Sequence, residues 1–208
     1  MPQAQSGRPA VFMDRDGCLI EEMGYLNHPS RVRILPRTAA AVARLNAAGI
    51  PALMATNQAG IARGYFSAET LAEINAEVVR QLASEGARLD GFYVCTHHPT
   101  AGSPPYRRLC DCRKPKPGLL QRAAEELGLD LSRSVMVGDK PSDVEAGQAA
   151  GAAGAAGVLV LTGYGRGEWE YLRHAWTVKP DHVAEDLLDA VAWALARFES
   201  EKGARCSR

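Results

Sequence analysis

The stretch that most constrains the fold is Ala10–Met13, a short apolar run that ends in two carboxylates, Asp14 and Asp16. Such a run predicts a strand buried on both faces, and the glycine after Asp16 lets the chain turn away. Positions two apart in an extended chain point to the same side, so both carboxylates can face one point. Ligands of open α/β sheets bind beyond the carboxyl ends of the strands, which makes this point a candidate site. Taken alone, a solvated acidic turn explains the motif equally well.

Further apolar runs alternate with stretches of helical periodicity along the chain. The predicted strands cover 10–13, 50–55, 91–95, 134–137 and 158–161, and the predicted helices cover about 36–49, 67–86, 115–128, 141–150 and 183–198. This alternation predicts an α/β, Rossmann-like fold with a mostly parallel sheet and helices on both faces. A chain this short leaves no room for a large cap domain, so a flap within 18–35 and the irregular loop 95–114 must cover the site.

We expect one domain over residues 1–208, with flexible tails at 1–9 and 199–208 and a flexible loop at 162–167, because no repeat or linker divides the chain. Its 24 basic and 24 acidic residues give a formal net charge of zero, which argues against a nucleic acid or an anionic membrane as partner. No apolar run approaches the ~20 residues of a membrane span, and the N-terminal segment lacks the apolar core of a signal peptide. We therefore expect a cytoplasmic monomer whose five cysteines are reduced.

Polar side chains end several of the predicted strands. Thr56 follows the second strand and Asp139 the fourth, and Lys114 lies beyond the third. Parallel strands end at one edge, so these groups should gather around Asp14 and Asp16. Carboxylates around one point favour Mg²⁺, while a hydroxyl and an ammonium group can bind phosphate oxygens. Singly, Asp139 is as easily read as a helix N-cap and Thr56 as a turn residue; jointly, the groups favour phosphoryl transfer, in which one carboxylate attacks and the other handles a proton.

A second cluster pairs soft ligands across a loop: Cys95, His97, Cys110 and Cys112. Four such ligands suit tetrahedral Zn²⁺ and leave no open position, so the site would be structural. The alternative is a set of scattered reduced cysteines with a surface histidine. A loop closed by zinc would fix the two cations that follow it, Arg113 and Lys114, against the active site. Without the metal, this segment is interpreted as a solvated basic turn.

The motifs Asp14-Arg-Asp-Gly, Thr56-Asn-Gln, Arg113-Lys-Pro and Gly138-Asp-Lys are together similar to the four motifs of the haloacid dehalogenase superfamily of phosphatases. Within it, the Cys-x-His and Cys-x-Cys pairs resemble the zinc-containing branch, which includes D-glycero-D-manno-heptose 1,7-bisphosphate 7-phosphatases and histidinol phosphatases. The stretches 56–66 and 95–99 most resemble the heptose enzymes. The resemblance covers residues 10–165.

The resemblance implies a role for each matching residue. Asp14 would be the nucleophile and Asp16 the general acid/base. Mg²⁺ would be held by Asp14, Asp139 and the backbone carbonyl of Asp16. Thr56 and Lys114 would bind the transferring phosphoryl group. The remaining substrate-site residues would be Glu22, Gly24, Tyr25, Asn57, Gln58, Arg113 and Lys140, of which Lys140 would also support the metal-site carboxylates. Two positions, Cys18 and Ile20, depart from many relatives; Cys18 is small enough to pack.

The expected activity is Mg²⁺-dependent removal of the C7 phosphate of a small sugar bisphosphate, D-glycero-D-manno-heptose 1,7-bisphosphate, in nucleotide-activated heptose and lipopolysaccharide biosynthesis. One alternative is a histidinol-phosphate phosphatase, whose site should offer negative charge to the amine of its substrate. The other is a zinc-dependent binding module without activity. That module would need a basic, aromatic-bearing surface, whereas aromatics make up only 6% of the residues and the net charge is zero.

Overall fold

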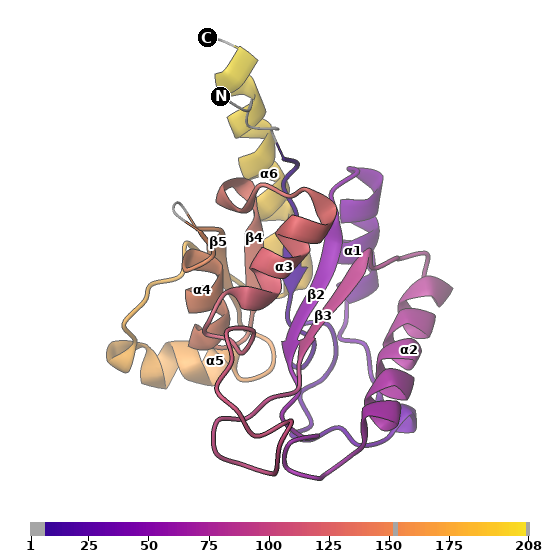
Figure 1. Ribbon diagram of the computed structural model, residues 1–208. Coiled ribbons are helices and arrows are strands. Elements are labelled where there is room, and N and C mark those ends of the chain that lie inside the picture. Colours follow the sequence, from indigo (N-terminus) through magenta and orange to yellow (C-terminus); the bar gives the residue numbers. More distant parts are fainter. Residues whose placement is uncertain (1–6, 152–153, 207–208) are drawn as a thin grey trace.

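In the computed structural model, which describes residues 7–151 and 154–206, six parallel strands form one sheet in the order β3-β2-β1-β4-β5-β6 (Figure 1). The strands are β1 (Val11–Met13), β2 (Ala52–Asn57), β3 (Gly91–Cys95), β4 (Val135–Gly138), β5 (Ala156–Val160) and β6 (His182–Ala184). The helices are α1 (Thr38–Ala47), α2 (Ala68–Ser84), α3 (Gly118–Leu127), α4 (Pro141–Gln148), α5 (Gly165–Gly167) and α6 (Leu187–Cys206). The predicted α/β architecture with a parallel sheet is confirmed.

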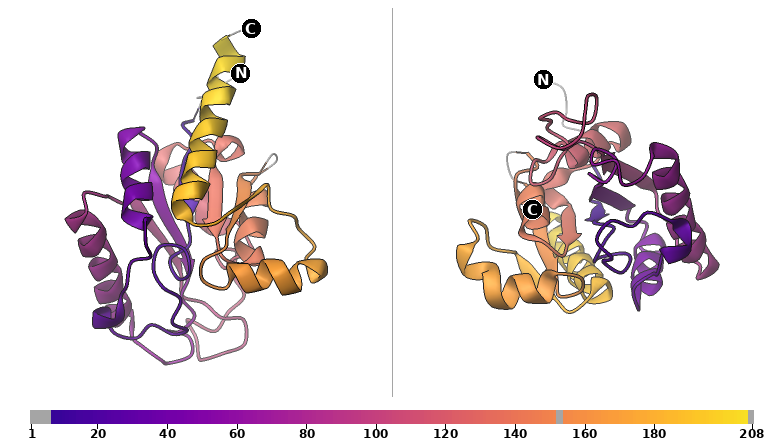
Figure 2. Two further views of the ribbon diagram at one scale, coloured as in Figure 1. Left: turned by 180° about the vertical axis from the view of Figure 1, so that it is seen from behind. Right: turned by 90° about the horizontal axis from the view of Figure 1, so that it is seen from below.

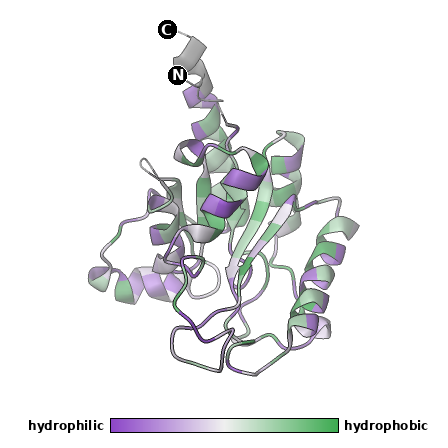
Figure 3. Ribbon diagram, viewed as in Figure 1, coloured by the Kyte–Doolittle hydropathy of each residue, from purple (hydrophilic) through white to green (hydrophobic). Residues whose placement is uncertain are grey.

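The central strand β1 is fully buried because helices cover both of its faces. Val11 and Met13 pack with residues of α1, α2 and α6, while Phe12, between them, packs with α3 on the opposite face. This is the alternation expected of extended chain. Figure 2 shows α1 and α6 covering the rear of the sheet. In Figure 3 the inner strands are coloured as hydrophobic, while the helices alternate between hydrophobic and hydrophilic residues.

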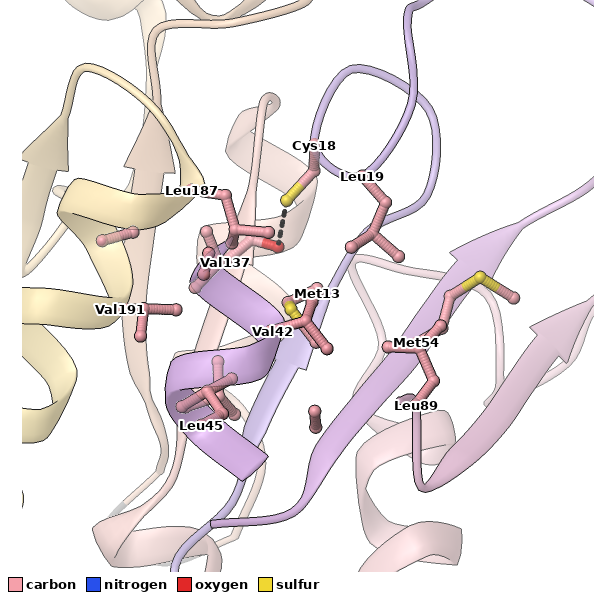
Figure 4. Packing of buried hydrophobic residues seen from close by; sticks show 14 of the residues in the cluster. Met13, Cys18, Leu19, Val42, Leu45, Met54, Leu89, Val137, Leu187 and Val191 are labelled. Carbon is pink, nitrogen blue, oxygen red and sulfur yellow. Dashed lines mark hydrogen bonds between the residues drawn. The ribbon is translucent and has the colours of Figure 1, made fainter. Parts of the chain in front are cut away.

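The two positions expected to differ from relatives are core residues. Cys18 and Ile20 are both buried in the cluster that contains Val11 and Met13. The Cys18 thiol lies 3.7 Å from the carbonyl oxygen of Val137 and packs among the side chains drawn in Figure 4. The expectation that Cys18 packs is therefore confirmed, and Ile20 belongs to the core.

The C-terminal part differs from the sequence prediction. Strand β6 was not predicted, because three residues at the sheet edge, two of them half-buried, are too few to show an alternation of buried and exposed positions. Helix α6 spans 187–206 instead of 183–198, so the stretch from 199 to 206 is helical, with an Arg197–Glu201 ion pair one turn apart. The segment expected to be a loop at 162–167 contains the short helix α5. The predicted tail residues 1–6 and 207–208 lie outside the described residues.

The strand order fixes where a ligand can bind. From β1 the chain moves outward to β2 and β3, then crosses to β4 on the other side of β1 and continues outward to β6. The edge beyond β1 and β4 is thus the topological switch point, where open α/β sheets bind ligands. The loops that follow the strands gather at this edge, at the bottom of Figure 1. Across the described ranges, no helix combines the length and the apolar character needed to cross a membrane.

Candidate active site

A cavity of about 720 Å³ opens at the carboxyl edge of the sheet. Its walls come from the ends of β1 and β2, from the flap before α1, from the loop after β3 and from the starts of α4 and α5. The residues predicted from sequence that line it are Asp14, Asp16, Glu22, Gly24, Tyr25, Asn57, Gln58, Arg113, Lys114 and Lys140. Parallel strand direction has brought together residues that are up to 126 positions apart, Asp14 and Lys140 being the extremes.

Asp14 occupies the cavity floor directly after β1. Its Oδ1 accepts a hydrogen bond from the backbone N–H of Arg15 at 2.8 Å and lies 3.0 Å from Nζ of Lys114. Burial favours the neutral acid, but the charge of Lys114, with hydrogen bonds from Lys114, Thr56 and Arg15, outweighs burial and lowers the pKa of Asp14. The carboxylate is therefore ionised, the form that can act as a nucleophile.

Lys114 is buried, and its ammonium group has three oxygen partners. Nζ donates to the carbonyl of Ala55 at 2.7 Å and pairs with Asp14 and Asp143, the latter at 2.6 Å. Burial alone would lower the pKa of Lys114, but Asp14 and Asp143 raise it, so the group stays charged. The side-chain amide of Asn57 accepts from N–H of Lys114 at 3.1 Å and donates to its carbonyl at 3.0 Å. Asn57, expected to meet substrate, here holds the backbone of Lys114.

Asp16 is held by two side chains. Arg15, itself fully buried, donates from Nε and Nη2 to the two Asp16 oxygens at 3.1 and 3.2 Å. Gln58 donates to Oδ2 of Asp16 at 2.7 Å and to Thr56 at 3.0 Å, and accepts from Arg15 at 2.8 Å. Burial raises the pKa of Asp16, although the charge of Arg15 opposes this. A carboxyl with a raised pKa, fixed beside an ionised one, is suited to general acid catalysis.

Three buried carboxylates, two at strand ends and one in the first turn of α4, could hold a metal ion. Asp14, Asp139 and Asp143 each offer an oxygen within 4.8 Å of the others. Burial raises the pKa of Asp139 to about 7 and that of Asp143 to about 6. Oδ1 of Asp139 is buried and has no hydrogen-bond partner among residues 7–151 and 154–206, so a cation would supply the missing partner. A Cβ at Gly17, where φ is +79°, would collide with the Asp139 carboxylate, so this position requires glycine.

Asp143 was not predicted, and it is the main addition to the site. One of its oxygens pairs with Lys114 and the other accepts from the backbone N–H of Lys140 at 3.1 Å. It lies at the third position of α4, four residues after Asp139. An acidic residue at this helical position often accepts a hydrogen bond from the N-cap backbone, and this pattern in the sequence could have indicated Asp143. Asp139 itself is not the N-cap of α4, because Lys140 occupies that position.

Lys140 joins three segments at one wall of the cavity. Its Nζ lies 3.1 Å from Glu22 of the flap, 3.8 Å from Asp139 and 4.6 Å from the ring centre of Tyr164. Glu22 also accepts from the N–H of Gly24 at 2.7 Å, which fixes the flap turn. Tyr164 was not predicted; its backbone N–H donates to Asp139 at 2.9 Å. The cavity lining also includes Ser142 and Glu168, which carried no sequence signal.

The predicted soft ligands converge on one point. Sγ of Cys112 lies 3.1 Å from Sγ of Cys95 and 3.4 Å from Sγ of Cys110, and 3.3 Å from Nδ1 of His97. All four ligand atoms lie within 4.8 Å of one another. Zinc–sulfur bonds of ~2.3 Å place tetrahedral sulfur ligands ~3.8 Å apart, close to the 3.7 Å between Cys95 and Cys110. The cluster could therefore hold a metal such as zinc.

Arg113 follows this cluster and lines the cavity half-buried. Its Nη1 donates to the carbonyl of His97 at 3.3 Å, which ties the guanidinium group to the loop that carries the soft ligands. Lys114, the next residue, is directed to the cavity floor, so the two neighbouring cations serve different parts of the site.

Comparisons with known proteins agree with this geometry. A family model described as HAD-hydrolase-like matches residues 111–190. The D-glycero-D-manno-heptose-1,7-bisphosphate 7-phosphatase of Thermosynechococcus vestitus is 44% identical over 191 residues, which cover 89% of this chain and 95% of that protein. The D-glycero-beta-D-manno-heptose-1,7-bisphosphate 7-phosphatase of Photorhabdus laumondii is 41% identical over 140 residues, covering 67% of this chain and 74% of that protein.

A solved structure shares the whole fold. The crystal structure of D,D-heptose 1,7-bisphosphate phosphatase from B. bronchiseptica, complexed with magnesium and phosphate, matches with a TM-score of 0.78 at 33% sequence identity. The match covers 90% of this chain and 98% of that one.

Proposed function

This chain belongs to the D-glycero-D-manno-heptose-1,7-bisphosphate 7-phosphatase family of HAD-like hydrolases, and from that premise we propose that it removes the C7 phosphate of this heptose bisphosphate. The proposal rests on the arrangement of charged side chains at the cavity floor. There an ionised Asp14, paired with the buried Lys114, lies beside Asp16, whose pKa is raised by burial. The two carboxyl groups thus differ in proton affinity in the direction that a nucleophile and a general acid require.

In the first step, a carboxylate oxygen of Asp14 forms a bond to phosphorus as the bond from phosphorus to O7 of the sugar breaks. Asp16 gives its proton to O7, so the sugar leaves as a neutral alcohol that still carries its C1 phosphate. Lys114 and the hydroxyl of Thr56 bind the oxygens of the transferring group. The enzyme is left as an aspartyl-phosphate at Asp14, with Asp16 ionised.

In the second step, Asp16 takes a proton from water while the water oxygen bonds to phosphorus. The bond from phosphorus to Asp14 breaks and inorganic phosphate leaves, which restores both carboxyl groups. Mg²⁺ held by Asp14, Asp139 and the backbone carbonyl of Asp16 would neutralise charge on the phosphoryl oxygens. Asp143, with both oxygens engaged, keeps Lys114 in place.

We also propose that the enzyme is a single-domain monomer and that it is located in the cytoplasm. It would act in nucleotide-activated heptose and lipopolysaccharide biosynthesis. Histidinol-phosphate phosphatase is the competing activity. The cavity lining includes Arg113 and Lys140, cations that suit a second phosphate better than an amine.

The test is turnover on both anomers of heptose 1,7-bisphosphate and on histidinol phosphate, with Mg²⁺ and after chelation. We expect Mg²⁺-dependent phosphate release with a higher kcat/KM for a heptose anomer. A higher kcat/KM for histidinol phosphate would assign the chain to the competing activity.

We further propose that the four soft ligands bind Zn²⁺. Freshly purified protein should contain about one zinc ion per chain, measured by elemental analysis. Cys110→Ala should lose activity, because Arg113 and Lys114 lose their support, while the far-UV circular dichroism of the sheet core is retained. Cys206→Ala, a change in the last turn of α6, is the matched control and should keep both zinc and activity. Protein purified without chelators that contains no zinc would refute this part of the proposal.

Arg113 should contribute to substrate choice. Hydrogen bonds to charged groups contribute roughly 1.5–3 kcal/mol, so Arg113→Ala should lower kcat/KM for the bisphosphate about 10- to 150-fold. A small aryl phosphate that does not extend to Arg113 should be hydrolysed almost as well as by the unaltered enzyme. Equal losses on both substrates would place Arg113 in the catalytic centre instead.

A further inference from the structure

The loop after β2 and the loop after β3 are in close contact. Gly102, in the loop after β3, has φ of +81°, and a Cβ there would collide with the carbonyl oxygen of Ala62, in the loop after β2. Both the positive φ and the close approach to the Ala62 carbonyl oxygen require glycine at position 102. It also brings the residue after Ala62, Arg63, against the loop after β3, with its Nη2 3.0 Å from Nε2 of His98.

The facing nitrogen atoms of Arg63 and His98 cannot form a hydrogen bond with each other. Nδ1 of His98 faces the backbone N–H groups of Ala101 at 2.8 Å and Thr100 at 3.2 Å, so Nδ1 must be the acceptor. The proton of the neutral ring is then on Nε2. A guanidinium group has donors only and does not lose its proton in proteins. Arg63 and Nε2–H of His98 are thus two donors directed at each other, and neither can accept.

A third donor group is close by. Nη1 of Arg113 donates to the carbonyl of His97, the residue before His98, at 3.3 Å. Arg63 also lies 6.0 Å from the ring centre of Tyr25, and the Tyr25 and Tyr65 rings are 4.5 Å apart, edge to face. Tyr25 and Arg113 line the cavity, so the group formed by Arg63, His98 and Arg113 borders it.

The surrounding charge is positive although the chain as a whole is neutral. Residues 96–114 contain four basic residues and one acidic residue. The acidic one, Asp111, pairs with Lys116 outside this stretch. Of the four, Arg107 and Arg108 are exposed, Lys114 pairs with Asp14 and Asp143, and Arg113 lines the cavity.

We propose that Arg63 and His98, together with Arg113, form a second anion-binding site that holds the distal phosphate of the substrate. One phosphate oxygen can accept from both Arg63 and Nε2–H of His98, which removes the conflict between the two donors. The inference rests on the proposed function, in which the substrate carries a second phosphate. It adds Arg63 and His98 to the specificity-determining residues.

The test separates binding from turnover by using the Asp14→Asn protein, which cannot complete the reaction. Calorimetry measures its affinity for heptose 1,7-bisphosphate and for heptose 7-phosphate, before and after a second change. Arg63→Gln removes one donor group. His98→Asn keeps an acceptor for the N–H groups of Thr100 and Ala101 but removes the Nε2–H donor. Arg107→Gln, an equal charge change at an exposed position of the same loop, is the control.

Each of the first two changes should weaken bisphosphate binding about 10- to 150-fold and leave 7-phosphate binding unchanged. Arg107→Gln should alter neither. Unchanged bisphosphate affinity in Arg63→Gln and His98→Asn, or equal losses for both ligands, would overturn the subsite while the proposed function stands. Failure of the Asp14→Asn protein itself to bind the bisphosphate would contradict the proposed function, and the subsite with it.

Discussion

Replacing Asp14 by Asn should abolish turnover, with kcat falling by about 10⁴- to 10⁶-fold, as for the loss of other enzyme nucleophiles. The amide has no carboxylate oxygen with which to form the phospho-enzyme. It also leaves Lys114, buried with Asp143, without one of its two anionic partners. Phosphate release from heptose 1,7-bisphosphate measures the effect, and mass spectrometry of acid-quenched protein should find no added phosphate.

The matched control is Glu125→Gln, the same exchange of carboxylate for amide at an exposed position of α3. It should leave kcat and the melting temperature unchanged. Near-normal turnover by Asp14→Asn, in protein free of contaminating phosphatase, would show that another group attacks phosphorus.

The second large effect is expected at Asp16. Asp16→Asn should lower kcat by roughly 10²- to 10⁴-fold, the usual contribution of general acid–base catalysis. Inorganic phosphate should still bind, because the charge of Lys114 and its pairing with Asp14 are unchanged. The measurements are steady-state kcat and calorimetric titration with phosphate.

The size of the Asp16 effect should depend on the leaving group. Aryl phosphates with acidic leaving groups need little protonation, so kcat/KM for them should fall less than for the sugar bisphosphate. An equal fall on both kinds of substrate would mean that Asp16 orients the site without transferring a proton.

Much of the fold was predictable because buried strands appear in the sequence as short, continuous apolar runs. The run at 10–13 and its two carboxylates indicated the central strand, and the alternation with helices indicated the parallel sheet. Strand β6, three residues long at a sheet edge, carries too little pattern to be found. The end of α6 was missed because a polar helical turn held by the Arg197–Glu201 pair resembles a tail in composition.

The site contains side-chain contacts that no sequence pattern predicts. The shared direction of the strands is enough to predict that Asp14 and Asp139 lie close together. The sequence does not predict which groups a side-chain amide will hydrogen-bond. Asn57 and Gln58 line the cavity as expected, yet their amides hold Lys114 and Asp16. Arg15 carried no signal, because arginine is usually exposed and only tertiary packing encloses this one between Asp16, Gln58 and Asn75.

The proposed reaction removes one particular phosphate of a sugar bisphosphate. Phosphorus NMR of heptose 1,7-bisphosphate incubated with the protein and Mg²⁺ follows the two phosphates separately. We expect the C7 ester signal to disappear as inorganic phosphate forms, while the C1 signal persists in the product heptose 1-phosphate. Loss of the C1 signal first, or no release at all from either anomer, would contradict it.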